Sequence, residues 1–137
     1  MAEPRFPVVT IGGVPVVDAP DEIDADNAES FDKLLLHAAS CGPRTVVVDM
    51  TRTRFCDSGG VRVLARAHER AVAAGGELLM VIPASAFVLS VFALTGLDRL
   101  IPNFADLQEA LAEAQAVIPG PLQRPATPSS DSGLPDS

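Results

Sequence analysis

The sequence has 137 residues, enough for one domain, and its 47% hydrophobic content is sufficient for a core, which excludes a chain disordered throughout. With six Phe, no Trp or Tyr and a formal net charge of −8, it has neither an aromatic platform nor the positive surface that nucleic acid requires, so we expect no nucleic-acid partner. No apolar run approaches the roughly 18 residues of a membrane span, and we expect no secretory signal, because the first residues lack a basic region followed by an apolar stretch. Cys41 and Cys56 form neither a disulfide framework nor a metal motif, so we expect a cytoplasmic protein without a membrane or metal site.

Two short β-prone runs open the folded part, Val8–Ile11 and Val14–Val17, separated by a Gly-Gly pair. Because glycine tolerates the positive φ angles of a two-residue hairpin turn, these runs are expected to pair antiparallel. A helix should follow from about Asp26, since Asp26 and Glu29 have the spacing of an N-terminal cap.

The later elements follow from changes in hydrophobic period. Thr45–Val48 is continuous and β-branched, which is typical of a central strand covered on both faces. A helix should begin near Ser58, and a second buried strand is expected at Leu78–Ile82. Pro83 and Ser85 are expected to open another helix that closes at Gly96, and a last helix should run from Ala105 to Val117. The residues expected on the inward face of the helix after Ser58 are Val61, Leu64, Ala65, His68 and Val72.

This order of elements contains two βαβ crossovers, which imply a mostly parallel sheet with one antiparallel strand from the hairpin. We therefore predict an α/β fold for residues 7–118, a small mixed sheet of about four strands layered with about four helices. In residues 119–137, Pro, Ser and Gly make up 11 of 19 residues. Such a composition buries too little apolar surface to offset the entropy of ordering, so this tail is expected to be disordered.

The segment Asp57-Ser58-Gly59-Gly60 places a serine hydroxyl at a helix start, beyond the end of a buried strand, where the sites of α/β proteins usually lie. One interpretation is structural: Asp57 or Ser58 caps the helix, and the glycines form the turn. A second is that the glycines leave the backbone unshielded, so that a partner protein approaches it closely.

The chemistry of Ser58 itself has two further interpretations. As a nucleophile it lacks support, because Cys56 stands where the G-x-S-x-G motif needs glycine, and His68 lies about 15 Å further along the same predicted helix. His37, on another helix, has nothing in the sequence to aim it. As a phosphorylation site it is well placed, because the helix amides and macrodipole stabilise an added charge of about −1.5 to −2. We expect a non-enzymatic protein without a cofactor.

At these residues the sequence resembles the STAS domain, in particular the bacterial anti-sigma factor antagonists. The resemblance is carried by VVVDMTRTRFCDSGGVRVL, with D-S-x-G at a helix start, and by AGGELLMVIP and LTGLDRLIPNFADLQEAL. The earlier segment EIDADNAESF is similar to the start of the family's first helix. Together these segments cover about Val8 to Ala116.

The resemblance implies a STAS-like fold and a function as an anti-sigma factor antagonist. Such a protein binds an anti-sigma factor that is also a serine kinase, and so frees a sigma factor. The kinase, which binds the ATP, phosphorylates the serine of D-S-x-G and thereby breaks the complex, and a phosphatase restores it. By position Ser58 is the acceptor, Asp57 its neighbour and Asp24 an acidic residue close to it, and we include Gly59, Gly60 and Val61 in the partner interface.

Three features depart from the family pattern. The first is Gly59, which follows Ser58 where the family often has a second serine. The run Asp18–Asp32 holds seven acidic residues and no base before Lys33, so it is either a solvated face or a patch for basic residues of a partner. The segment AFVLSVFALTG is apolar nearly all round and must be buried or must present a patch. We assign Ala86, Leu89, Phe92 and Ala93 to the core. The face expected to contact a partner, or a second copy in a homodimer, contains Phe87, Val88 and Val91.

A different class of function stays open at this point. A STAS domain can also be a constitutive subunit that docks on a transporter or a signalling scaffold and is never phosphorylated. The Asp57-Ser58 pair favours the switch, because a scaffold has no need of an acceptor.

Overall fold

The computed structural model describes residues 8–40, 45–84 and 86–117, so Cys41, Ser85 and the predicted tail at 119–137 lie outside the described residues. The strands are β1 (Val8–Ile11), β2 (Val14–Asp18), β3 (Glu22–Ile23), β4 (Val46–Asp49), β5 (Phe55–Cys56), β6 (Leu78–Val81) and β7 (Asn103–Phe104). The helices are α1 (Ala28–Ala39), α2 (Ser58–Ala73), α3 (Phe87–Thr95), α4 (Leu97–Leu100) and α5 (Leu107–Val117).

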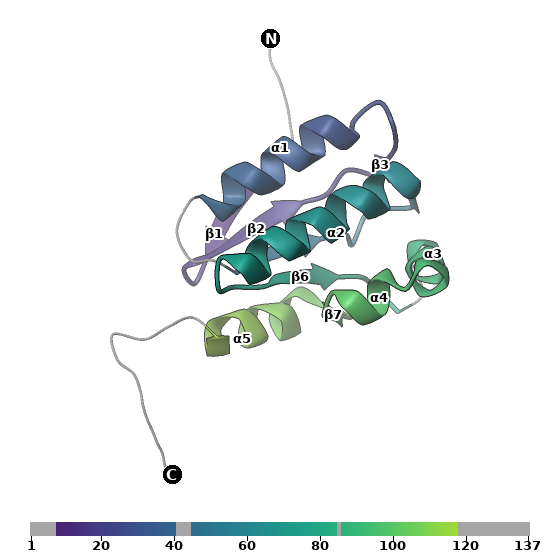
Figure 1. The fold of residues 1–137 in the computed structure, drawn as a ribbon. Helices are drawn as coiled ribbons and strands as arrows, with labels where there is room; N and C mark the ends of the chain where they lie inside the picture. Colours follow the sequence, from purple (N-terminus) through teal and green to yellow (C-terminus); the bar gives the residue numbers. More distant parts are fainter. Residues whose placement is uncertain (1–7, 41–44, 85, 118–137) are drawn as a thin grey trace.

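Five strands form the main sheet in the order β1-β2-β4-β6-β7, in which β1 is antiparallel to β2 and the other neighbours are parallel. Helices α1 and α2 cover one face and α5 covers the other (Figure 1). The predicted α/β class with a mostly parallel sheet is confirmed. The sheet has one strand more than expected, because the two-residue strand β7 pairs with β6, and β3 and β5 form a separate pair.

The predicted hairpin is confirmed. Ile11 pairs with Val14, and the two residues between them, Gly12 and Gly13, have φ angles of 58° and 84°. A side chain at either position would be strained by that backbone conformation, so the Gly-Gly pair dictates this turn.

The central strands are buried on both faces, as the continuous β-branched run predicted. Val46 and Val48 pack in a large cluster beneath α1 and α2, whereas Val47 points to a smaller cluster beneath α5. Strand β6 alternates in the same way, with Leu78 and Met80 on the first side. Because successive side chains of a strand point to opposite faces, two helical layers are needed to cover one apolar strand.

Helix α1 begins at Ala28, two residues later than expected. Its N-cap residue is Asn27, whose amide side chain turns back to accept from the Asp24 amide and to donate to the Glu22 carbonyl. The predicted cap by Asp26 is therefore wrong. Helix α4 was also missed, because its four residues are too few to show a helical period.

Helix α2 buries a different face from the predicted one. Its buried residues are Gly60, Val63, Leu64, Ala67 and Ala71. Val72 is 53% exposed, and Val61, Ala65 and His68 are only half-buried, so Leu64 alone of the predicted set lies in the core. The reason is tertiary: α2 packs against α1 as well as the sheet, and its small residues allow that approach. Among the described residues, no helix has both the length and the apolar character that crossing a membrane requires.

Candidate functional site at the starts of two helices

Ser58 is the first residue of α2 and its side chain is exposed to solvent. The preceding residue, Asp57, is the N-cap, and its Oδ1 accepts a hydrogen bond from the Gly60 amide at 3.1 Å. This bond satisfies one of the amide groups that every helix start leaves unpaired. Because Asp57 makes the cap, the Ser58 hydroxyl is not needed to begin the helix.

The short strands β3 and β5 bring a distant part of the chain to Ser58. They pair in parallel, with Ile23 opposite Cys56, and the Asp57 amide donates to the Ile23 carbonyl at 3.0 Å. The residues that follow the two strands, Asp24 and Asp57, therefore leave them at the same end. Two acidic residues separated by 33 positions in the sequence thus leave paired strands at the same end, and Ser58 directly follows one of them.

Asp24 is fixed by its own turn. Its amide donates to the Asn27 side chain, its Oδ1 accepts from the Asp26 amide at 3.0 Å, and its carbonyl accepts from the Ala28 amide at 2.8 Å. The start of α1 then lies against the start of α2, since a Cβ atom on Gly59 would stand 3.9 Å from Ala28 Cβ. The positive ends of two helix dipoles meet at this place.

The two glycines after Ser58 have different roles. Gly59 is half-buried, and a Cβ atom there would have Asp57 Oδ1 as its nearest neighbour, at 3.2 Å. Gly60 is buried, and a Cβ there would stand 2.7 Å from Ile23 Cγ2 and would overlap Cys56 Sγ. Close packing of α2 on β3 and β5 therefore requires a glycine at position 60. The Gly60 amide already donates its hydrogen bond to Asp57. The expectation that Gly60 offers an open backbone to a partner is wrong.

Cys56 lies beneath this corner and is 2% exposed. Burial raises the pKa of its thiol from the usual 9.0 to about 12, and the negative charge of Asp57 adds to the effect. The thiol therefore stays protonated at neutral pH and behaves as a small apolar side chain.

Most of the acidic run forms ion pairs within the molecule, and the paired carboxylates other than that of Asp32 are at least 40% exposed, which fits the interpretation as a solvated face. Asp18 and Asp21 lie within 4.0 Å of Arg52, and Glu22 lies 3.6 Å from Arg54. The other pairs are Glu29 with Lys33 and Asp32 with both Arg66 and Arg70. Asp24 and Asp26 are the two members of the run that have no ion pair among the described residues. Of these two, Asp24 directly follows β3, the strand that pairs with β5 ahead of Asp57.

Helix α3 exposes part of the predicted partner face and buries another part. Phe87 is 68% exposed and Val91 is half-buried, but Val88 is fully buried in the large core cluster, so its assignment to the exposed face is wrong. Leu94, which was not among the residues predicted for this face, is 89% exposed. Residues 87, 91 and 94 recur at the helical spacing i, i+4, i+7 and share one side of α3. We call Phe87, Val91 and Leu94 the α3 face.

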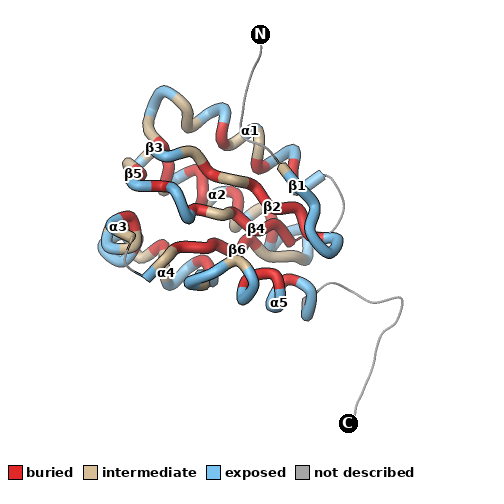
Figure 2. The backbone as a smooth tube through the Cα atoms, turned by 180° about the vertical axis from the view of Figure 1, so that it is seen from behind, coloured by how far each residue is buried: buried red, intermediate tan, exposed pale blue. Residues whose placement is uncertain are grey.

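The α3 face lies at the same end of the molecule as Ser58. Helix α3 contacts β5, which leads directly into Asp57 and Ser58 and whose Phe55 is 44% exposed. Figure 2 shows β3, β5 and α3 gathered at one end of the sheet, away from the far end of α5. Val61, one turn into α2, is half-buried and packs at the edge of the core.

The histidine of α2 does not stand beside Ser58. His68 lies ten residues further along α2, about 15 Å by the helix rise, and its Nδ1 is buried without a hydrogen-bond partner. Within the part of the chain that the structure describes, no group of three or more His, Cys, Asp or Glu side chains gathers as a metal site would require. This end of the molecule instead carries an exposed hydroxyl, two carboxylates and the exposed apolar residues of α3.

Comparison with known proteins gives one family and one fold. The STAS domain family model matches residues 5–110. An anti-sigma factor antagonist from Mycobacterium paratuberculosis is 27% identical, with a TM-score of 0.72 over 81% of this chain and 93% of that one. The anti-sigma factor antagonist SpoIIAA, in its unphosphorylated form, is 21% identical, with a TM-score of 0.67 over 83% and 99% of the two chains.

A transporter also contains this fold. The murine Solute Carrier 26 family member A9 anion transporter is 22% identical, with a TM-score of 0.63 over 77% of this chain and 18% of that one. At this level of identity the likeness shows the fold alone. No curated protein matches the sequence.

Proposed function

This chain belongs to the STAS domain family, and we propose that it is an anti-sigma factor antagonist switched by phosphorylation of Ser58. In the unmodified state it binds an anti-sigma factor that has serine kinase activity, and a sigma factor is freed. The kinase supplies the bound ATP and phosphorylates Ser58, which ends the complex, and a phosphatase reverses the step. The protein itself performs no catalysis in this scheme.

One observation carries the proposal: the hydroxyl of Ser58 is exposed and is not used to hold the fold. Asp57 provides the cap of α2 through its bond to the Gly60 amide, and Ser58 is outside the core. A kinase therefore gains access to the acceptor without unfolding any element. A serine that capped the helix itself would lose that bond on modification.

The charges around Ser58 support release after phosphorylation. A phosphate adds about −1.5 to −2 charge and three acceptor oxygens. The fold accepts this anion for two reasons. The amides of Ser58 and Gly59 come before the Gly60 amide, which is the one that Asp57 caps, and the positive end of the helix dipole lies here. A partner that fits the unmodified surface then meets extra bulk and charge beside Asp24 and Asp57, so affinity falls while the domain stays folded.

The α3 face supports the view that the partner contacts a larger surface than a peptide bound around Ser58 would. Exposed aromatic and aliphatic side chains at the centre of a contact surface supply much of the affinity of a complex, and Phe87 and Leu94 are of this kind. Phe55 is on β5, the strand that contacts α3 and leads directly into Asp57 and Ser58. We therefore place Phe55, Ser58, Phe87 and Leu94 in one interface.

The first experiment maps the phosphate. The full chain is incubated with a candidate anti-sigma kinase and ATP, and the product is mapped by mass spectrometry. We expect one phosphate on Ser58, none on Ser58→Ala, and wild-type labelling of Ser30→Ala, since Ser30 is also exposed in the first turn of a helix. Equal labelling of Ser58→Ala and wild type would show that the acceptor lies elsewhere.

The second experiment measures the effect of charge on binding. Ser58→Glu should bind the kinase at least about tenfold more weakly than wild type, because a charge is placed in a fitted interface. Its melting temperature should stay within a few degrees of wild type, since the anion lies at a helix N-terminus. A Ser58→Glu protein that is globally unfolded contradicts a switch confined to the surface. Constitutive binding to a transporter or scaffold, without phosphorylation by any candidate kinase, would instead favour the assembly-subunit function.

A further inference from the structure

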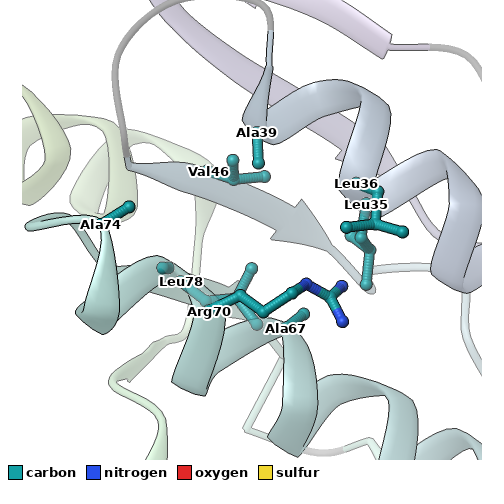
Figure 3. A pocket seen from close by; sticks show the side chains of 9 residues that line it. Leu35, Leu36, Ala39, Val46, Ala67, Arg70, Ala74 and Leu78 are labelled. Carbon is teal, nitrogen blue, oxygen red and sulfur yellow. The ribbon is translucent and has the colours of Figure 1, made fainter.

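A hollow lies between the second halves of α1 and α2, at the end of the molecule opposite Ser58. Its volume is about 110 Å³, and its floor includes Val46 and Leu78, the first residues of β4 and β6 (Figure 3). Ser58 begins α2 and the hollow lies near its end, so about 20 Å of helix separates the two places.

Small side chains create this hollow. Ala39 closes α1, and Ala67, Ala71 and Ala74 recur along the side of α2 that faces it. Methyl groups at these positions leave a space that leucine side chains would fill. Leu36, at the rim of the hollow on α1, is 43% exposed, so a large apolar side chain is left in contact with water there.

One charged side chain, that of Arg70, lines the hollow beside these apolar groups. Arg70, which lines the hollow, donates from Nη2 to Asp32 Oδ1 at 3.0 Å, and Arg66 lies 3.8 Å from the other oxygen of the same carboxylate. Figure 3 shows the Arg70 side chain reaching from α2 towards Leu35 and Leu36 of α1. Among the described residues, Asp32 is the one ion-pair partner of both arginines. Two guanidinium groups share one carboxylate, in a chain whose formal net charge is −8.

We propose that this hollow binds a small amphipathic carboxylate, such as a short-chain fatty acid or an aromatic acid. The apolar part of this ligand lies among the alanines and leucines. Its carboxylate pairs with Arg70, while Arg66 remains paired with Asp32. An apolar cavity of about 150 Å³ holds a benzene ring, so a space of about 110 Å³ that opens to solvent suits a chain of about five carbons. A guanidinium group accepts such a carboxylate through two parallel hydrogen bonds.

The test compares three probes of equal length on the full chain: hexanoate, hexan-1-ol and hexylammonium. Amide chemical shifts are followed by NMR during each titration. We expect hexanoate to shift the amides of Ala39, Ala71 and Ala74 saturably, hexan-1-ol to bind at least about fivefold more weakly, and hexylammonium not to bind. A preference for the anion would oppose the net charge of the whole chain, so only a local cation explains it.

Two variants locate the site. Ala74→Leu, at an exposed rim position, should fill the hollow and weaken hexanoate binding about tenfold or more. Arg70→Gln should abolish the preference for hexanoate over hexan-1-ol, whereas Arg62→Gln, on the exposed side of α2, should keep it. The absence of any saturable shift with hexanoate, equal binding of all three probes, or wild-type binding by both Ala74→Leu and Arg70→Gln overturns the proposal.

Discussion

Gly60 and Ile23, separated by 37 positions in the sequence, are in such close contact that any side chain on Gly60 would meet Ile23. A Cβ atom on Gly60 would stand 2.7 Å from Ile23 Cγ2, which is closer than two carbon atoms approach in folded proteins. This contact presses the start of α2 against β3, and it sets where Ser58 stands relative to the turn that contains Asp24. The geometry of the candidate site therefore rests on a glycine in the core.

Gly60→Ala should destabilise the protein by about 2 kcal/mol, because the added methyl overpacks a closed corner between Ile23 and Cys56. Gly59→Ala is the matched control, since the neighbours of its Cβ stand at 3.2 Å or more, and its effect should stay within about 1 kcal/mol. Urea unfolding followed by circular dichroism measures both. Equal stability of the two variants would mean that the corner is not closely packed.

Asp57→Ala should cost about 1 kcal/mol of folding free energy, because the Gly60 amide loses its partner. Asp57→Asn should cost only a few tenths of a kcal/mol, since an asparagine oxygen caps a helix equally well. The same unfolding assay separates the two variants. A loss as large in Asp57→Asn as in Asp57→Ala would assign the effect to the charge rather than to the hydrogen bond.

Substitutions on the two sides of α3 should have opposite consequences. Phe87→Ser and Leu94→Ser should change the free energy of unfolding by less than about 0.5 kcal/mol, because both side chains are exposed. Both should weaken binding of the kinase partner. Val88→Ala should instead cost about 2 kcal/mol, because it leaves a cavity in the core, and should leave the affinity of the folded protein unchanged.

Sedimentation of the α3 variants separates a partner surface from a surface between two copies of this chain. If the wild-type protein sediments as a dimer and Phe87→Ser sediments as a monomer, the α3 face joins two copies of the chain. Unchanged kinase affinity in both serine variants would remove the face from the partner interface.

Cys56 should resist alkylation in the folded state. In a Cys41→Ser background, which leaves Cys56 as the one cysteine of the sequence, its thiolate fraction at pH 8 is about a thousandfold lower than that of a thiol with a pKa of 9.0. Iodoacetamide labelling before and after unfolding in urea measures the difference. Rapid labelling of the folded protein would contradict the burial of this thiol.

The same pKa shift has a consequence for stability. The folded state holds the Cys56 proton up to a pH of about 12, whereas the unfolded thiol loses it near 9.0. The contribution of the protonated Cys56 thiol to the free energy of unfolding is therefore complete below pH 9, and it is lost progressively as the pH rises from 9 towards 12. In the same background, Cys56→Ala should lower stability at pH 7 and should flatten this alkaline decline.

The long elements could be predicted from the sequence because their signals are local. The Gly-Gly turn, the β-branched run of β4 and the helical period after Ser58 each depend on residues close together in the chain, and so does the helix end at Gly96, whose φ is 83°. The place of Ser58 at a helix start belongs to this group, since a strand, a connector and a helix start suffice to predict it.

Other features were decided by tertiary packing. The strands β3 and β5 have two residues each, too few for a period, and they exist because segments some 30 residues apart meet beneath α2. That α2 buries Ala67 and Ala71 rather than Val72, and that α3 buries Val88, depends on which neighbour covers each side. An apolar residue has no preference for one apolar contact over another, so its pattern indicates that a helix is covered but not from which side.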